Sequence, residues 1–177
     1  MNVVLDACTL INLINGEVLQ KIILLPRFIF NVSDNLLDQE ILDQAQKLYI
    51  EVLLNDGHLK LLESNVTLSE FTNLKNEYDL GDGETECLAL CKKNNLHFAS
   101  DDFKARKCGV KELGEQRVVG SLFFLRESVA NQVLTCDEAK NGFALMKSKG
   151  GYLPKVDEAY LCPPTLSSPI TSTAIDF

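Results

Sequence analysis

Histidine is almost absent from this chain, which contains only His58 and His97 among its 177 residues. A zinc site would therefore have to rely on cysteines, and the six cysteines are scattered along the sequence. Cys87 and Cys91 lie four residues apart on one face of an expected helix, without further ligands close by in the sequence. We expect no zinc centre, and we expect buried thiols rather than a disulfide framework.

Long apolar runs and excess positive charge are also missing. No apolar run has the length needed to span a bilayer, and the first residues lack the pattern of a secretory signal, so we expect a cytoplasmic protein. The chain has 17 Lys and Arg against 25 Asp and Glu, for a net charge of −8. This balance argues against nucleic-acid binding through bulk positive charge. It leaves open a nuclease whose acidic cluster is neutralised by bound cations.

What the chain does contain is an alternation of short apolar segments with helical patterns. Strands are expected at 2–5, 27–32, 58–63, 96–99 and 117–119. Helices are expected at 10–24, 33–57, from 67 onward, at 84–93, at 103–109 with a stop at Gly109, after 120, and at 136–150. This alternation predicts one α/β domain with a mainly parallel sheet over residues 1–153. Residues 154–177 hold four of the five prolines and many Ser and Thr, which predicts a C-terminal tail.

Carboxylates follow two of the expected strands. Asp6 comes directly after the first strand, and Asp101 and Asp102 come after the strand at 96–99. Glu84 begins the helix before that strand, and Glu40 lies in the helix after the second strand. Because ligands bind beyond the carboxyl ends of strands in an open parallel sheet, these side chains could meet above one edge.

Each of these carboxylates also has a purely structural interpretation. Asp6 and the Asp101–Asp102 pair could cap helices, Glu84 could interact with a helix dipole, and Glu40 could face solvent. The placement of all these carboxylates at successive strand-to-helix junctions nevertheless favours a shared site. Clustered carboxylates stay ionised together when cations lie between them, and oxygen ligands suit Mg²⁺ or Mn²⁺. Such ions can activate a water against a phosphodiester, so no Ser, Cys or His nucleophile is needed.

Two other enzyme classes fit the sequence poorly. A haloacid-dehalogenase-type phosphotransferase needs a second aspartate two residues after Asp6, and Cys8 occupies that place. A dinucleotide-binding loop could be built on Gly81 and Gly83, but no strand precedes them and a third glycine is missing.

Several stretches together resemble the PIN domain family, most closely its toxin-type ribonucleases of toxin–antitoxin pairs. They are "VVLDACTLINL", "GDGETECLALC" and "HFASDDFKARK", and the resemblance extends from residue 2 to about 153. It implies a three-layer α/β/α sandwich with a parallel sheet. It also implies acidic residues that hold Mg²⁺ or Mn²⁺ and cleave single-stranded RNA. Partners implied by the resemblance are a small antitoxin protein and a second copy in a homodimer.

The resemblance also assigns residues to the acidic site. Asp6 matches the first acid and Glu84 the acid that opens the later helix. Glu40 is the choice for the second acid, with Asp38 as its alternative. The last acid falls on Asp101 or Asp102, and spacing slightly favours Asp102 as the catalytic residue, while both are expected to contact the metal.

Residues around these acids are expected to support them. The family often has a hydroxyl or amide two places after the first aspartate, where this chain has Cys8, and Thr9 could supply the hydroxyl instead. Lys104, Arg106 and Lys107 follow the aspartate pair and are the candidate RNA contacts. The alternative function is a non-catalytic PIN-like module that binds RNA or a protein.

Overall fold

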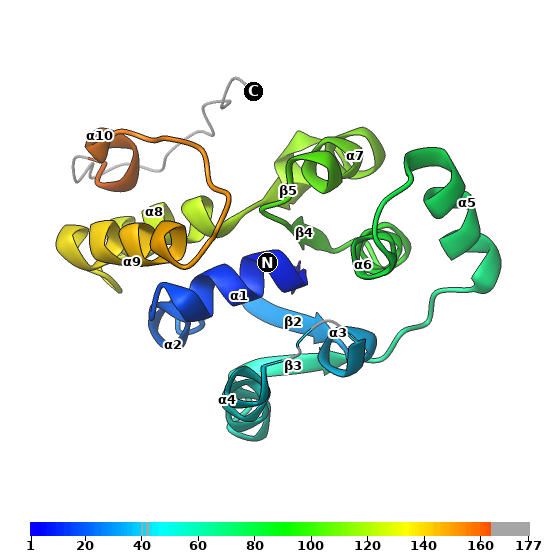
Figure 1. Ribbon diagram of the computed structural model, residues 1–177, viewed down its shortest axis with the longest axis horizontal. Helices are drawn as coiled ribbons and strands as arrows, with labels where there is room; N and C mark the ends of the chain where they lie inside the picture. Colours follow the sequence, from blue (N-terminus) through cyan, green and yellow to red (C-terminus); the bar gives the residue numbers. More distant parts are fainter. Residues whose placement is uncertain (40, 42, 164–177) are drawn as a thin grey trace.

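The computed structural model describes residues 1–39, 41 and 43–163, apart from the side chains of Asp38 and Gln39. Five parallel strands form one sheet in the order β3-β2-β1-β4-β5 (Figure 1). The strands are β1 (Asn2–Leu5), β2 (Ile29–Ser33), β3 (Leu59–Leu62), β4 (His97–Ala99) and β5 (Val118–Val119). The expected parallel sheet is therefore confirmed.

Helices cover both faces of this sheet (Figure 1). One side carries α1 (Ala7–Asn15), α2 (Leu19–Ile22), α8 (Ser121–Ala130) and α9 (Cys136–Ser148), and the other carries α5 (Leu68–Tyr78), α6 (Asp82–Lys93) and α7 (Phe103–Leu113). Near β2 and β3 lie α3 (Asp34–Gln39) and α4 (Gln44–Asn55), and a short α10 (Glu158–Leu161) follows α9. The expected α/β/α sandwich is confirmed.

Two separate hydrophobic cores fill the spaces between the sheet and the helices. Val3 and Leu5 of β1 belong to the larger core, whereas Val4 between them belongs to the smaller one, which includes Leu88 and Phe98. Successive side chains of a strand point to opposite faces, so an uninterrupted apolar strand supplies both cores. This explains why Val3, Val4 and Leu5 are all apolar and all buried.

Strand register aligns the residues that follow the central strands. Val4 pairs with Asn31 of β2 and Leu5 with Ala99 of β4. Continued to the next positions, the same register places Asp6 between Ser33 and Ser100. The Asp6 backbone N–H donates to Ala99 O at 3.0 Å, which extends the β1–β4 pairing to this point.

The single helix expected over 33–57 is wrong, because the structure has two helices there. Ser33 starts α3 by accepting a hydrogen bond from Leu36 N at 3.3 Å. Asp43 starts α4 as a new N-cap, accepting from Gln46 N at 2.8 Å. A capping side chain in extended backbone begins a fresh helix, and this signal outweighed the continuous apolar periodicity.

The expected stop of a helix at Gly109 is also wrong. Helix α7 continues to Leu113 and ends before Gly114, whose φ of +87° suits glycine. Gly109 is instead needed for close packing of α7 against the sheet. A Cβ at this position would lie 2.9 Å from Phe98 Cδ1 and 3.1 Å from Val118 Cγ2.

Gly109→Ala is expected to lower the free energy of unfolding by about 1–3 kcal/mol, because the methyl group overpacks a buried contact. In an open helix position the same change would stabilise by about 0.5–1 kcal/mol. Urea denaturation of both proteins measures the difference. An alanine variant more stable than the natural chain would show that Phe98 can move aside at no cost.

The described part of the expected tail packs on the domain. Helix α10 lies against α8 and α9, with Leu161 buried, and residues 164–177 lie outside the described part. Cys162 forms a disulfide with Cys136 at the start of α9, with a Cα–Cα distance of 5.4 Å. The expectation of thiols throughout is therefore wrong for this pair, because the fold brings together two cysteines 26 residues apart. Cys8, Cys87, Cys91 and Cys108 are thiols that take no part in this disulfide.

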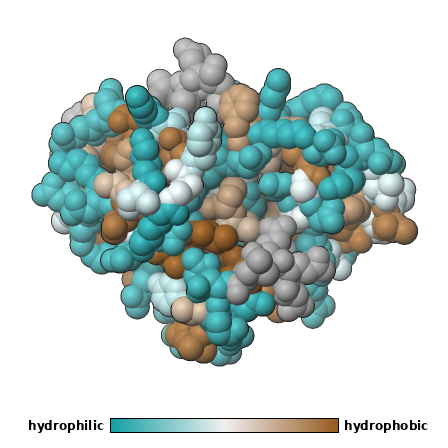
Figure 2. Space-filling model, viewed as in Figure 1, coloured by the Kyte–Doolittle hydropathy of each residue, from teal (hydrophilic) through white to brown (hydrophobic). Residues whose placement is uncertain are grey.

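The surface in Figure 2 is hydrophilic over much of the viewed face, with hydrophobic residues near its centre and over α4 at its lower edge. Exposed apolar side chains of α4 include Leu48 and Val52. Among the described helices, none is both long and apolar enough to cross a membrane.

Candidate active site

Asp6 lies at the carboxyl end of the central strand and is buried, with 2% of its surface exposed. It is the N-cap of α1, and its Oδ1 accepts a hydrogen bond from Thr9 N at 2.8 Å. The Cys8 thiol lies 3.1 and 3.0 Å from the two carboxylate oxygens and donates to them. The cap interpretation is thus correct, but an ordinary cap is exposed to water and this one is not.

Burial raises the pKa of Asp6 from 3.8 to about 7. Removal from water disfavours the charged form, and the nearby Asp101 carboxylate adds to this effect. Hydrogen bonds from Cys8, Ser100 and the Thr9 backbone favour the charged form and partly offset it. At neutral pH the carboxylate therefore holds its proton much more tightly than an exposed aspartate does, and a cation beside it would compete with that proton.

Asp101 is the second carboxylate of this site. Its two oxygens accept hydrogen bonds from Asn12 Nδ2 and from Ser121 N, each at 2.8 Å. Ser121 is the first residue of α8, so a helix N-terminus faces the carboxylate. Gly120 allows this approach, since a Cβ there would lie 2.6 Å from Asp101 Oδ1.

Cys8 connects the Asp6 carboxylate to the backbone of Asp101. While its thiol donates to Asp6, its sulfur accepts from Asp101 N at 3.2 Å and lies 3.6 Å from Ser100 Oγ. Cys8 therefore performs the positioning role for which Thr9 was the candidate. Thr9 contributes its backbone N–H instead, and its hydroxyl has no partner among the described residues.

The Asp102 carboxylate points toward the start of α7, whereas that of Asp101 points toward Asn12 and Ser121. It is the N-cap of α7 and accepts from Ala105 N at 2.7 Å, while its own N–H donates to Ser100 Oγ at 3.1 Å. Of this pair, Asp101 is the one whose charge is among the main causes that raise the pKa of Asp6. The structure thus brings Asp101 to Asp6 and uses Asp102 to begin a helix.

Glu84 and Glu86 differ as Asp102 and Asp101 do: the first caps a helix and the second lies near Asp6. Glu84 closes a capping box at the start of α6, its Oε2 accepting from Gly81 N at 2.6 Å. Glu86, two residues later, is 5% exposed and accepts hydrogen bonds from Ser33 Oγ at 3.3 Å and Asn35 Nδ2 at 2.5 Å. Ser33 is the register neighbour of Asp6, so Glu86 stands beside the acidic pair on the β2 side.

Sequence reasoning missed Glu86, although a signal was present. Glu86 lies four residues before Leu90, on the inward stripe of α6 that also carries the expected buried residues Cys87 and Cys91. A glutamate on a stripe that the pattern assigns to the core needs polar partners there. Glu40 lies outside the described residues, as does the side chain of its alternative, Asp38.

The three basic residues differ in their availability. Lys104 donates to Asp79 O at 2.5 Å, at the junction of α5 and α6, and Arg106 donates to Ser100 O at 3.1 Å. Lys107 is exposed on α7. Arg106 is therefore the one held against the strand end that carries Asp101.

The oxygen atoms of this site suit a hard divalent cation, although they are not gathered closely around one point. Asp6, Asp101 and Glu86 offer carboxylate oxygens, and the buried Ser121 hydroxyl has no partner among the described residues. Within that same part of the chain, no three His, Cys, Asp or Glu side chains are grouped closely enough to hold a metal ion. The fit therefore rests on the oxygen chemistry of the residues.

Comparison with known proteins gives two matches. The profile of the family described as DUF3368, PIN domain, matches residues 2–158. The crystal structure of PAE2754 from Pyrobaculum aerophilum superposes with a TM-score of 0.51 at 15% identity, covering 72% of this chain and 90% of that one. At this identity the structural match supports the fold alone. No curated protein matches the chain.

Proposed function

Because this chain belongs to the PIN domain family (DUF3368), whose members are typically nucleases that bind divalent metal ions, we propose that it is an endoribonuclease. Its substrate is single-stranded RNA, and it depends on Mg²⁺ or Mn²⁺. The observation that supports this best is the meeting of Asp6 and Asp101 at the carboxyl edge of the parallel sheet, linked through Cys8.

The chain's own residues position the acids. Cys8 and Thr9 N fix the Asp6 carboxylate, and Asn12 and Ser121 N fix that of Asp101. We assign metal binding to Asp6 and Asp101, with Glu86 beside them.

The sequence also offered Glu40, Glu84 and Asp102 as acids; of these, Glu84 and Asp102 make capping hydrogen bonds at the starts of α6 and α7, and Glu40 lies outside the described residues. A bound divalent ion supplies Lewis acidity and an activated water for phosphodiester hydrolysis.

A nuclease assay tests this proposal directly. Purified protein is expected to cleave a single-stranded RNA when Mn²⁺ or Mg²⁺ is added, and EDTA is expected to stop cleavage. Since water is the attacking group, the products should carry no 2′,3′-cyclic phosphate. Cyclic ends would show attack by the RNA 2′-hydroxyl and would contradict the mechanism.

A second function is favoured by the absence of a three-ligand group among the described residues. On this view the chain is a non-catalytic PIN-like module that binds RNA or a protein. The same preparation distinguishes the two, because the module would retain RNA intact in the presence of Mn²⁺. A small antitoxin, a homodimer and a cytoplasmic location belong to the toxin version of the proposal.

A further inference from the structure

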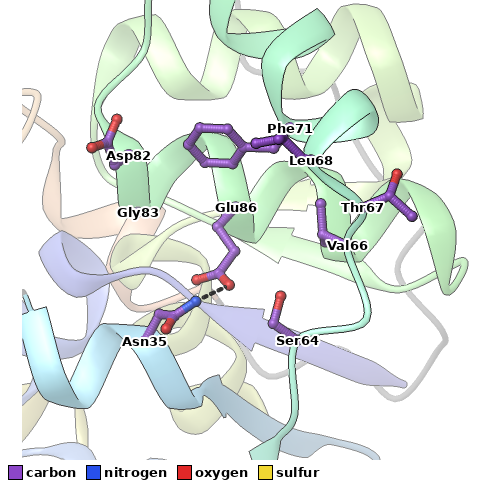
Figure 3. Close-up of a pocket in the computed structure, with 9 residues that line it drawn as sticks. All are labelled: Asn35, Ser64, Val66, Thr67, Leu68, Phe71, Asp82, Gly83 and Glu86. Carbon is purple, nitrogen blue, oxygen red and sulfur yellow. Dashed lines mark hydrogen bonds between the residues drawn. The ribbon is translucent and has the colours of Figure 1, made fainter.

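A pocket of about 400 Å³ lies next to the proposed active site, between the starts of α3, α5 and α6 (Figure 3). Figure 3 shows the Phe71 ring on one side of it and Glu86 with Asn35 on the other. Val66 and Leu68 extend the apolar side, and Leu68 is 81% exposed. The pocket thus has one flat apolar wall and one polar wall.

Glu86 joins this pocket to the acidic site. Its Oε2 accepts from Ser33 Oγ at 3.3 Å, and Ser33 is the register neighbour of Asp6 on the adjacent strand. Neighbouring strands lie about 4.8 Å apart, so Glu86 contacts the residue that stands directly beside Asp6 in the sheet, and the Glu86 end of the pocket is the end nearest the acidic site.

The charge of the pocket limits what can occupy it. None of the nine described residues that line it is Lys or Arg, whereas two of them, Asp82 and Glu86, carry carboxylates. Lys75 pairs with Asp82 at 2.8 Å, so the negative charge of the pocket comes from Glu86, and this charge disfavours a phosphate group beside it. The occupant must be neutral or positive, and it must present hydrogen-bond donors to the polar wall.

The polar wall consists mainly of acceptors. Asn35 donates its amide nitrogen to Glu86 at 2.5 Å, which leaves its Oδ1 without a hydrogen bond from the described residues. The Glu86 carboxylate receives two hydrogen bonds and has further lone pairs. Ser64 adds a hydroxyl oxygen at the same wall (Figure 3).

We propose that this pocket is a subsite for an unpaired guanine base of the RNA. The proposal rests on the nuclease function and adds a specificity to it. The base stacks on Phe71, as unpaired bases stack on aromatic side chains. Guanine presents two adjacent donors, N1–H and N2–H₂, on its Watson–Crick edge. Adenine and cytosine each present a donor next to an acceptor, and uracil a single donor between two acceptors.

Binding of free nucleosides tests the pocket without requiring RNA cleavage. Guanosine, adenosine, cytidine and uridine are titrated separately into metal-free protein, with the methyl resonances of Val66 and Leu68 followed by NMR. Guanosine is expected to shift these resonances at lower concentration than the other three. Phe71→Leu should weaken guanosine binding about tenfold, because it keeps apolar bulk and loses the stacking face. The matched control is Phe143→Leu, a partly buried phenylalanine on α9, which should leave binding unchanged.

Several outcomes of these titrations would overturn the proposal. Shifts of equal size with all four nucleosides, or none with guanosine in the natural protein, would overturn the proposal whatever the variants do. Shifts with arginine amide in place of guanosine would overturn it too and would identify a pocket for a protein side chain. Nucleoside binding without RNA cleavage would remove the nuclease proposal alone, and cleavage without nucleoside binding would remove the subsite alone.

Discussion

Asp6→Asn is expected to abolish Mn²⁺-dependent RNA cleavage while making the metal-free protein more stable at neutral pH. Cleavage is lost because an amide replaces a carboxylate at the centre of the site. Changing a residue that only supports a metal ligand lowers metal affinity or activity about 10–100-fold, and changing a ligand itself should lower them at least as much. The gain follows because a buried charge disappears. A variant that retains cleavage would contradict the assignment of Asp6.

The raised pKa of Asp6 determines how the stability of the folded protein changes with pH. The pKa of Asp6 is raised from 3.8 to about 7, so the folded protein binds this proton more tightly than the unfolded chain. The resulting stabilisation is full below about pH 4 and is lost as the pH rises through about 7. At about 1.4 kcal/mol for each pH unit, the loss is at most about 4 kcal/mol. Asp6→Asn removes this loss.

Urea denaturation in EDTA at acidic and at slightly alkaline pH measures the effect. The natural protein should lose stability between the two conditions, and Asp6→Asn should lose much less. Asp43→Asn is the matched control, because Asp43 also caps a helix, through Gln46 N at 2.8 Å, but is exposed. Asparagine caps as well as aspartate, so this control should change neither stability nor cleavage. An identical pH response in Asp6→Asn and the natural chain would show that Asp6 does not titrate near neutrality.

Asp101→Asn and Asp102→Asn are expected to differ sharply although the two residues are adjacent. Asp101 faces Asp6, so its amide variant should lose at least about a hundredfold in cleavage and lose the rise in melting temperature produced by Mn²⁺. Asp102 caps α7 through Ala105 N, and asparagine can accept the same hydrogen bond. Asp102→Asn should therefore keep both its stability and its activity.

Cleavage rates and Mn²⁺ titrations followed by thermal unfolding compare the two variants. The thermal data also show whether Asp101→Asn remains folded, since its carboxylate accepts from Asn12 and Ser121 N. The reverse pattern, with Asp102→Asn inactive and Asp101→Asn active, would make Asp102 the last acid, as the sequence spacing slightly favours.

The fold could be predicted because its signals are local. Apolar strands such as Val3–Leu5 alternate with helical patterns, and the capping box from Thr67 to Glu70 marks the start of α5. These patterns depend on residues close together in the chain, and they predict the parallel sheet and its helical layers. They failed where two local signals competed, as at Asp43, where a cap divides an otherwise continuous helical pattern.

The sequence by itself determined which acids could stand at strand ends, since Asp6 directly follows one apolar strand and the Asp101–Asp102 pair follows another after one residue, Ser100. Only the tertiary structure decided which of them meet. Strand register and backbone direction turn Asp101 toward Asp6 and Asp102 toward α7, and they place Glu86 beside Ser33. Burial then changes the chemistry, because the pKa of Asp6 depends on water excluded by residues far away in the chain. Such contacts between distant segments leave no local pattern in the sequence.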